Sequence, residues 1–430
     1  MFKLKYNFLA LFQVMIGFLN FFLLMKVFGI SDATDAYLIV SAIFGALLLL
    51  QMLTTEQFLF FYNDIKSKDK EDAHRFYHSA LGVAAVTSVV MFIVSYFGTG
   101  FIVDIFVNNS DVKRTALIDS FFYIAVFELL VAPMQSLNQK LLNAEMYFSM
   151  PYILNIIPQF FVLLCMFYLY CFNIKEIEFL IYAKVVGAFF SFFISFIIVH
   201  KIDIKIKFRL QHKELKSFLK NSFSMRLGHN IHNFLFTPIT TNLLTSLPSG
   251  YASYFYYAMK IATIINSIVV GPFTNVFQAN FSKEWSNKHI LNAKKLIFKY
   301  MKSVIPLIVV SSVIGYFLLP LVLNFLIYNS TNESVVMIQR LFAGLMIWQF
   351  IILVESGSVF ILIVEKQSKM FIYTNLIFSM MYFGFANYFL DEFSIYGVIY
   401  SLIISQIVNF MIYTYYGQKT LQQRLKQYEA

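Results

Sequence analysis

The chain has 430 residues, of which 59% are hydrophobic and 13% charged, and its formal net charge is +10. Because an average soluble domain carries about 25% charged residues, this composition excludes a soluble globular protein and predicts an all-α, polytopic membrane protein. A spanning helix needs about 20 apolar residues, so the length accommodates about twelve spans and no separate soluble domain.

Apolar runs separated by polar breaks predict the spans in chain order. The expected spans are residues 7–28, 37–62, 78–99, 115–136, 152–172, 178–200, 221–245, 251–279, 298–327, 336–364, 370–390 and 394–416. They group into an N-terminal six-helix bundle, a cytoplasmic linker, a C-terminal six-helix bundle and a cytoplasmic tail, at residues 1–200, 201–220, 221–416 and 417–430. Weak similarity between the halves suggests a parallel repeat, which is a common design in transporters.

The basic residues are distributed asymmetrically along this pattern. Most of the 33 lysines and arginines lie near the termini or in the breaks after even-numbered spans, whereas the odd-numbered breaks hold only Lys113, Arg114 and Lys175. The positive-inside rule therefore predicts a bacterial inner-membrane protein with both termini in the cytoplasm. The same asymmetry explains the net charge without a nucleic-acid partner, and the basic loops are expected to attract anionic membrane lipids.

Bases inside spans are the first candidates for a binding site, because a charge in the bilayer is costly. Lys260 lies about ten residues into span eight, which places it roughly 15 Å deep at 1.5 Å per residue. We therefore expect Lys260 to line a water-filled cavity and to bind a substrate diphosphate. Arg226 is expected at the cytoplasmic entrance, where a snorkelling role fits it equally well, and Lys26 and Lys184 are expected nearer the outer exit.

Three acids inside spans, Glu128, Glu355 and Glu56, are candidates for coupling transport to an H⁺ or Na⁺ gradient. Intramembrane acids commonly mark ion pathways, which supports this interpretation. For Glu128 and Glu355 a neutral carboxyl group hydrogen-bonded between helices is an equal alternative. For Glu56 the alternative is hydrogen bonding between spans.

Span seven is unusually polar, which is typical of a helix that lines a cavity. It contains His229, Asn233 and Asn242. His229 and His232 share one helical face, but no third ligand stands at a recognisable spacing, so we expect no metal site. The sequence also contains no phosphate-binding Gly-rich loop and no nucleophile motif, so we expect neither an enzyme nor a resident cofactor.

Two segments resemble the multidrug/oligosaccharidyl-lipid/polysaccharide exporter superfamily. They are FGISDATDAYLIVSAI at residues 28–43 and SGYASYFYYAMKIATIINSIVVGPFTNVFQANFSKEW at residues 249–285. The pattern is closest to the branch of lipid II flippases and O-antigen or capsule repeat-unit flippases. The resemblance implies that Asp35, in TDAY, matches a cavity acid of that branch, and that Lys260, in YYAMK, matches a base of its cationic central cavity.

The departures from lipid II flippases concern two features. Their arginine-rich first spans are largely absent here, which leaves Lys26, and the chain lacks the two extra C-terminal spans of that group. The expected function is therefore translocation of an undecaprenyl-diphosphate-linked oligosaccharide of the O-antigen or capsule type, by alternating access of the two bundles. A polymerase and glycosyltransferases of the same pathway are the expected protein partners.

Three alternatives to this function remain open. They are a lipid II flippase, a multidrug cation antiporter of the same fold, and a membrane-embedded polysaccharide polymerase or glycosyltransferase. The antiporter requires acids rather than a base such as Lys260 at the centre of the cavity. The enzyme requires a large outer loop, and the longest one expected, near residues 100–114, is short.

Overall fold

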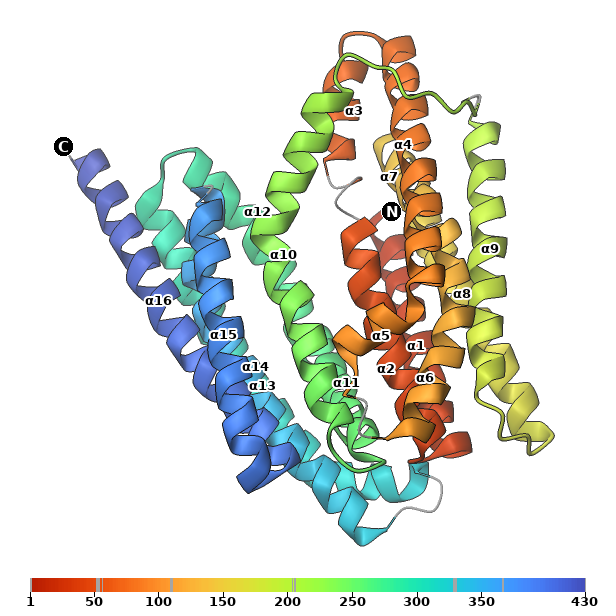
Figure 1. The fold of residues 1–430 in the computed structure, drawn as a ribbon. Helices are drawn as coiled ribbons and strands as arrows, with labels where there is room; N and C mark the ends of the chain where they lie inside the picture. The colour runs from red at the N-terminus through yellow and green to blue at the C-terminus, as the bar shows by residue number, and fades with distance from the viewer. Residues whose placement is uncertain are drawn as a thin grey trace. The chain divides into compact units, whose positions relative to one another are not determined.

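The computed structural model describes residues 2–51, 55, 57–108, 111–202, 204, 206–327, 331–365 and 367–429. These residues form helices and short connections, and they divide into two compact units. Unit 1 contains residues 1–246 and 326–328, and unit 2 contains residues 247–325 and 329–430. The predicted all-α, polytopic membrane fold is confirmed (Figure 1).

Unit 1 is built from ten α-helices and one 3₁₀ helix within the described residues. They are α1 (Phe2–Phe28), α2 (Asp32–Gln51), α3 (Phe58–Lys66), α4 (Lys70–Phe97), α5 (Thr99–Phe106), α6 (Val112–Ala125), η2 (Val126–Leu130), α7 (Ala132–Ala144), α8 (Ser149–Cys171), α9 (Glu178–Lys201) and α10 (Leu215–Thr245). Within the part of the chain that the structure describes, seven helices of the two units are long and apolar enough to cross a bilayer, or eight if the bent pair at residues 112–144 counts as one span.

Each expected span falls on a helix, but spans two, four and eight are each divided into two. In span four, α6 continues into η2, and α7 then leaves at an angle of 41°. Pro133 stands in the first turn of α7, where its missing N–H and its ring prevent the preceding helix from continuing through it. The bend therefore lies at a proline, which is a common position for a kink.

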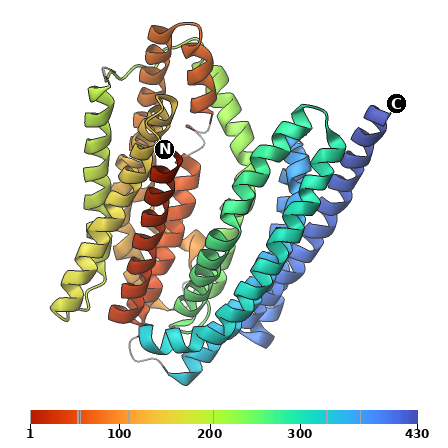
Figure 2. The ribbon, with the colours of Figure 1, turned by 180° about the vertical axis from the view of Figure 1, so that it is seen from behind.

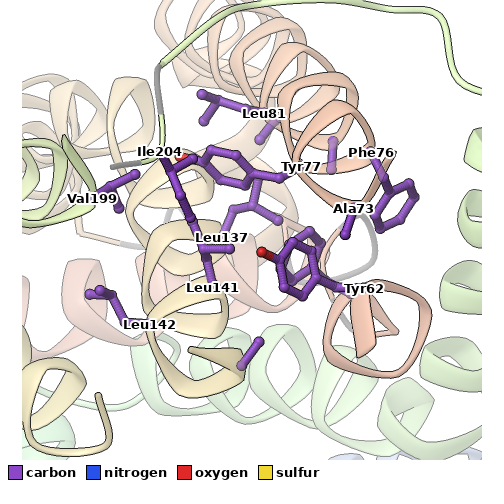
Figure 3. Packing of buried hydrophobic residues seen from close by; sticks show 14 of the residues in the cluster. Tyr62, Ala73, Phe76, Tyr77, Leu81, Leu137, Leu141, Leu142, Val199 and Ile204 are labelled. Carbon is purple, nitrogen blue, oxygen red and sulfur yellow. The ribbon is translucent and has the colours of Figure 1, made fainter. Parts of the chain in front are cut away.

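The core of unit 1 combines aromatic packing with hydrogen bonds between helices. Tyr62 and Tyr77 are fully buried near Leu137 and Leu141 of α7 (Figure 3). The Tyr77 hydroxyl donates to Asn138 Oδ1 at 2.8 Å, and Asn138 Nδ2 donates to Ser195 Oγ at 2.9 Å. Such bonds hold spans together where the hydrophobic effect between helices is absent, and they join α4, α7 and α9.

The linker strap, residues 206–214, lies across α4 instead of hanging free (Figure 1). The Arg209 N–H donates to the carbonyl of His78 at 3.2 Å, and Ser79 Oγ donates to the carbonyl of Gln211 at 3.0 Å. A Cβ on Gly82 would lie 2.0 Å from the Arg209 carbonyl oxygen. Only glycine therefore allows the strap to approach α4 this closely.

Helix α10, which follows the strap, packs within unit 1. After the strap, α10 contacts α2, α3, α4 and α5, and its Phe218 is buried against Phe61 and Phe76. Contacts thus place α10 in unit 1, whose main segment ends at Ser246.

Unit 2 consists of long helices that run side by side (Figure 2). They are α11 (Tyr251–Val269), α12 (Gly271–Ser286), α13 (Ile290–Leu326), α14 (Asn332–Val364), α15 (Ser368–Phe393) and α16 (Ile395–Glu429). α14 packs against α11 and α16, and Trp348 Nε1 donates to Gln406 Oε1 at 3.1 Å between α14 and α16. α13 exposes Phe317 and Leu321, each to 70%, as expected of a helix that faces lipid.

Candidate functional site

Lys260 projects from an exposed polar stripe on α11. The stripe consists of Tyr256, Lys260, Thr263 and Ser267, of which the last three are exposed and Tyr256 is half-buried. The opposite face of α11 is buried through Ala252, Phe255, Ala258 and Ala262. No described residue forms an ion pair or a hydrogen bond with the Lys260 ammonium. An unpaired cation on a polar helical face can accept an anionic ligand such as a phosphate group.

The residues of α10 that were expected at the site are only partly within the described structure. The side chains of Arg226, His229 and Asn233 lie outside the described residues, as does Glu56. Asn242 is half-buried near the end of α10, and its carbonyl oxygen accepts from the Ser246 N–H at 3.2 Å. Their roles at a site therefore stay predictions.

Asp35 and Lys26 lie close to the helix ends of unit 1. Asp35 is completely buried in the first turn of α2, and its Oδ2 lies 3.8 Å from Nη1 of the buried Arg114 in α6. Nη2 of Arg114 donates to the carbonyl of Thr245, the last residue of α10. These contacts join α2, α6 and α10, whereas Lys26 is half-buried near the end of α1.

Arg114 is the residue that sequence reasoning placed in a loop and the structure places in the interior. An aspartate three residues earlier, Asp111, caps α6 by accepting from the Lys113 and Arg114 N–H groups. That cap was the available signal, because it starts the helix before the arginine. A buried guanidinium needs a carboxylate and acceptors, and Asp35 and Thr245 supply them.

The structure brings together two residues that were predicted for different roles. Nζ of Lys184 in α9 lies 3.2 Å from Oε2 of Glu128 in η2. The same ammonium lies 4.5 Å from the centre of the Phe44 ring. The predicted diphosphate contact and the predicted coupling acid therefore form one ion pair at the break in span four.

Glu355 is buried in unit 2, with 6% of the residue exposed. Its Oε2 has no hydrogen-bond partner among the described residues. The neighbouring Gln406 uses its Oε1 to accept from Trp348, so its amide NH₂ group is the one available to Glu355. This environment suits a hydrogen-bonded carboxyl group, one of the two roles predicted for Glu355.

Two further glutamates were missed by sequence reasoning, and each follows a helix directly. After α7, Glu145 accepts from the Tyr62 hydroxyl at 2.6 Å and from Lys66 Nζ at 2.7 Å. Burial alone would raise the pKa of Glu145, but these two hydrogen bonds outweigh burial and lower the pKa. The aromatic residue and the lysine are four apart in α3, which presents both on one face.

After α14, Glu365 has the same kind of surroundings. Its oxygens accept from Arg424 Nε at 2.8 Å, from Arg424 Nη2 at 2.7 Å and from Trp285 Nε1 at 2.8 Å. Burial acts to raise the pKa of Glu365, but the hydrogen bonds from Arg424 and Trp285 lower it below its usual range. The contacts join α12 and α16 to the end of α14.

Metal chemistry receives no support from the part of the chain that the structure describes. No group of three or more His, Cys, Asp or Glu side chains there is arranged to hold a metal ion. Cys165 and Cys171 are both free thiols.

Solved structures share this fold. A structure described as "Lipid II flippase MurJ, inward closed conformation" superposes with a TM-score of 0.79 and 16% identity, covering 97% of this chain and 89% of the other. A MATE family multidrug resistance transporter in its inward-facing conformation superposes with a TM-score of 0.77 and 11% identity, covering 96% of both chains. At these identities the likeness concerns the fold.

Sequence comparisons identify one family within this group of folds. A "Probable lipid II flippase MurJ" of Buchnera aphidicola subsp. Schizaphis graminum is 25% identical over 282 residues, which are 63% of this chain and 54% of the relative. A protein of the same description from Buchnera aphidicola subsp. Baizongia pistaciae is 23% identical over 392 residues, 87% of this chain and 75% of the relative. The family model of the lipid II flippase MurJ matches residues 24–428. The chain therefore belongs to the MurJ family of lipid II flippases, within the exporter superfamily that its sequence resembles.

Proposed function

We propose that this protein translocates the lipid-linked peptidoglycan precursor lipid II from the inner to the outer leaflet of the cytoplasmic membrane. The family membership and the two curated relatives support lipid II as the substrate. The first relative is matched over only 54% of its length, so its activity is carried over here as a proposal. The family is one of transporters, which confirms the prediction that the chain is not an enzyme.

The expected O-antigen or capsule substrate is wrong, and the polymerase and glycosyltransferase partners inferred from it receive no support from the family match. The match at residues 24–428 overturns it in favour of the lipid II alternative. The error came from giving weight to two departures, the few basic residues in the first spans and the two extra C-terminal spans that were expected in a lipid II flippase. A family match that extends over nearly the whole chain outweighs a difference in charge at a few positions.

The observation that carries the proposal is the exposed polar stripe of α11, in which the Lys260 ammonium pairs with no residue that the structure describes. A lipid-linked diphosphate needs a cation within a hydrophilic surface, because its charge cannot cross hydrocarbon unaided. Lys260 supplies that cation, and its sign is opposite to what a cationic drug requires. The positive-inside pattern supports an orientation with both termini in the cytoplasm.

Replacement of Lys260 tests the proposal in a bacterium depleted of its own lipid II flippase. The wild-type chain is expected to support growth and to expose lipid II on the outer leaflet, and Lys260→Arg is expected to retain both. Lys260→Ala is expected to lose most of the activity while membrane levels stay normal. Failure of the wild-type chain to translocate lipid II, in cells and in proteoliposomes, would overturn the proposed substrate.

A further inference from the structure

The ion pair between Glu128 and Lys184 stands at the one bent pair of helices found in the described residues. Glu128 belongs to η2, the 3₁₀ segment between α6 and α7. Broken spans of transporters commonly carry substrate and ion sites, because the interruption frees polar groups inside the membrane. The position of this pair therefore points to a binding role in addition to packing.

The two partners differ in how far they are enclosed. The Glu128 side chain is 12% exposed, and its Oε2 has no hydrogen-bond partner besides the ion pair within the described structure. The Lys184 side chain is 34% exposed, and the Phe44 ring covers only part of its ammonium. The lysine can thus reach a ligand that the carboxylate cannot.

The groups that surround Glu128 in the described structure are aromatic rings, tyrosine hydroxyl groups and one lysine. Tyr37 of α2 interacts electrostatically with Glu128 and with Cys165 of α8. On the α4 side, Phe92 and Tyr96 pack against Phe127, the residue before Glu128, and Tyr96 also contacts Tyr123. From α9, Lys184 faces it. Among the described residues, Lys184 is therefore the cation that balances this acid.

We propose that Lys184 is a second phosphate-binding residue. While Glu128 is ionised, its carboxylate pairs with the Lys184 ammonium. When Glu128 takes up a proton, the ammonium becomes available to the diphosphate of the lipid substrate. The carboxylate takes one proton from the aqueous phase and becomes neutral, and no covalent bond to the substrate forms or breaks. The lysine keeps its charge and exchanges a carboxylate partner for a phosphate partner. The identity of the anion rests on the proposed function.

Thermodynamic linkage fixes the sign of this coupling. A proton on Glu128 leaves the Lys184 charge without a counter-ion inside the membrane, which is costly until an anion binds. Proton binding and anion binding therefore strengthen one another by the same factor. Coupled sites typically show factors of roughly 5 to 150, so acidification is expected to tighten diphosphate binding within that range.

Binding of difarnesyl diphosphate to the full chain in nanodiscs tests the proposal, because each phosphate of this diester keeps one negative charge in both buffers, and farnesol is the probe that lacks phosphate. The wild-type affinity for the diphosphate is expected to rise from alkaline to acidic buffer, and the farnesol affinity to stay constant. Glu128→Gln, a neutral mimic of the protonated acid, is expected to bind tightly in both buffers. Lys184→Met is expected to bind weakly in both, and Glu176→Gln, an exposed acid just before α9, is expected to behave like the wild type.

Two results would overturn the proposal. One is a wild-type affinity that does not depend on pH, which needs no variant to interpret. The other is a Glu128→Gln variant that folds and keeps the wild-type pH dependence, which would make the pair a structural contact. If either occurs while the wild-type chain still translocates lipid II, the proposed function stands and this inference alone fails.

Discussion

Arg424→Ala is expected to destabilise unit 2 at the end of α14. The change removes two charge-assisted hydrogen bonds to Glu365, at 2.8 and 2.7 Å, and leaves that carboxylate with the Trp285 N–H. Such bonds contribute about 1.5 to 3 kcal/mol each. Because the Arg424 side chain is 35% exposed, solvent screening reduces the sum, and we expect a loss of about 2 kcal/mol.

Thermal unfolding of the purified protein in nanodiscs measures this loss. For a unit of this size about 2 kcal/mol corresponds to a fall in Tm of roughly 4 to 8 °C. Since the folded pKa of Glu365 is lowered, its stabilisation is present above the unfolded pKa and disappears as the pH falls through the folded pKa. The difference between wild type and variant should therefore shrink in acid. Equal Tm values for Arg424→Ala, the wild type and Lys419→Ala, an exposed control on the same helix, would refute the reasoning.

Three further changes probe unit 1. Glu145→Gln should lower the Tm near neutral pH and make the Tm less dependent on pH in acid. The reason is that the pKa of Glu145 is lowered in the folded state, so its contribution to stability disappears as the pH falls through that folded pKa. Identical melting curves of variant and wild type over this pH range would show that the contact does not stabilise the fold. Gly82→Ala should lift the strap and speed tryptic cleavage at Arg209, whereas Gly45→Ala, with open space around it, should leave the digest unchanged. Arg114→Lys should cost roughly 1 to 3 kcal/mol, since one ammonium cannot replace a buried guanidinium with two partners; an unaltered melting curve would contradict this.

The spans could be predicted because hydropathy reports directly on burial in lipid, and each expected span lies on a helix. The divisions of spans two, four and eight were not predicted, because hydropathy averaged over a whole span does not detect a short interruption of the helix. Pro133 lay within the expected span four, yet proline is tolerated in many membrane helices. Its effect depends on neighbouring helices that the sequence does not place.

For the candidate site the sequence supplies residue types but not pairings, and the binding roles of those residues stay predictions. A base deep in a span has to face something polar, so the exposure of Lys260 follows from its depth. Lys184 and Glu128 were assigned separate roles, because their contact depends on how α9 packs beside η2. Arg114 was counted among loop charges, since the count ignored that α6 begins two residues before it.

Because the strap packs against α4 at Gly82, it is part of unit 1 and is a poor place to divide the chain into two co-expressed polypeptides. A gene split inside residues 206–214 would put α10 on the second polypeptide, whereas its neighbours α2, α3, α4 and α5 would be on the first. Helix α10 would then have to pack against a separate chain. A split in the short connection at residues 247–250 keeps α10 with those neighbours. Co-expressed halves divided there are the ones expected to assemble.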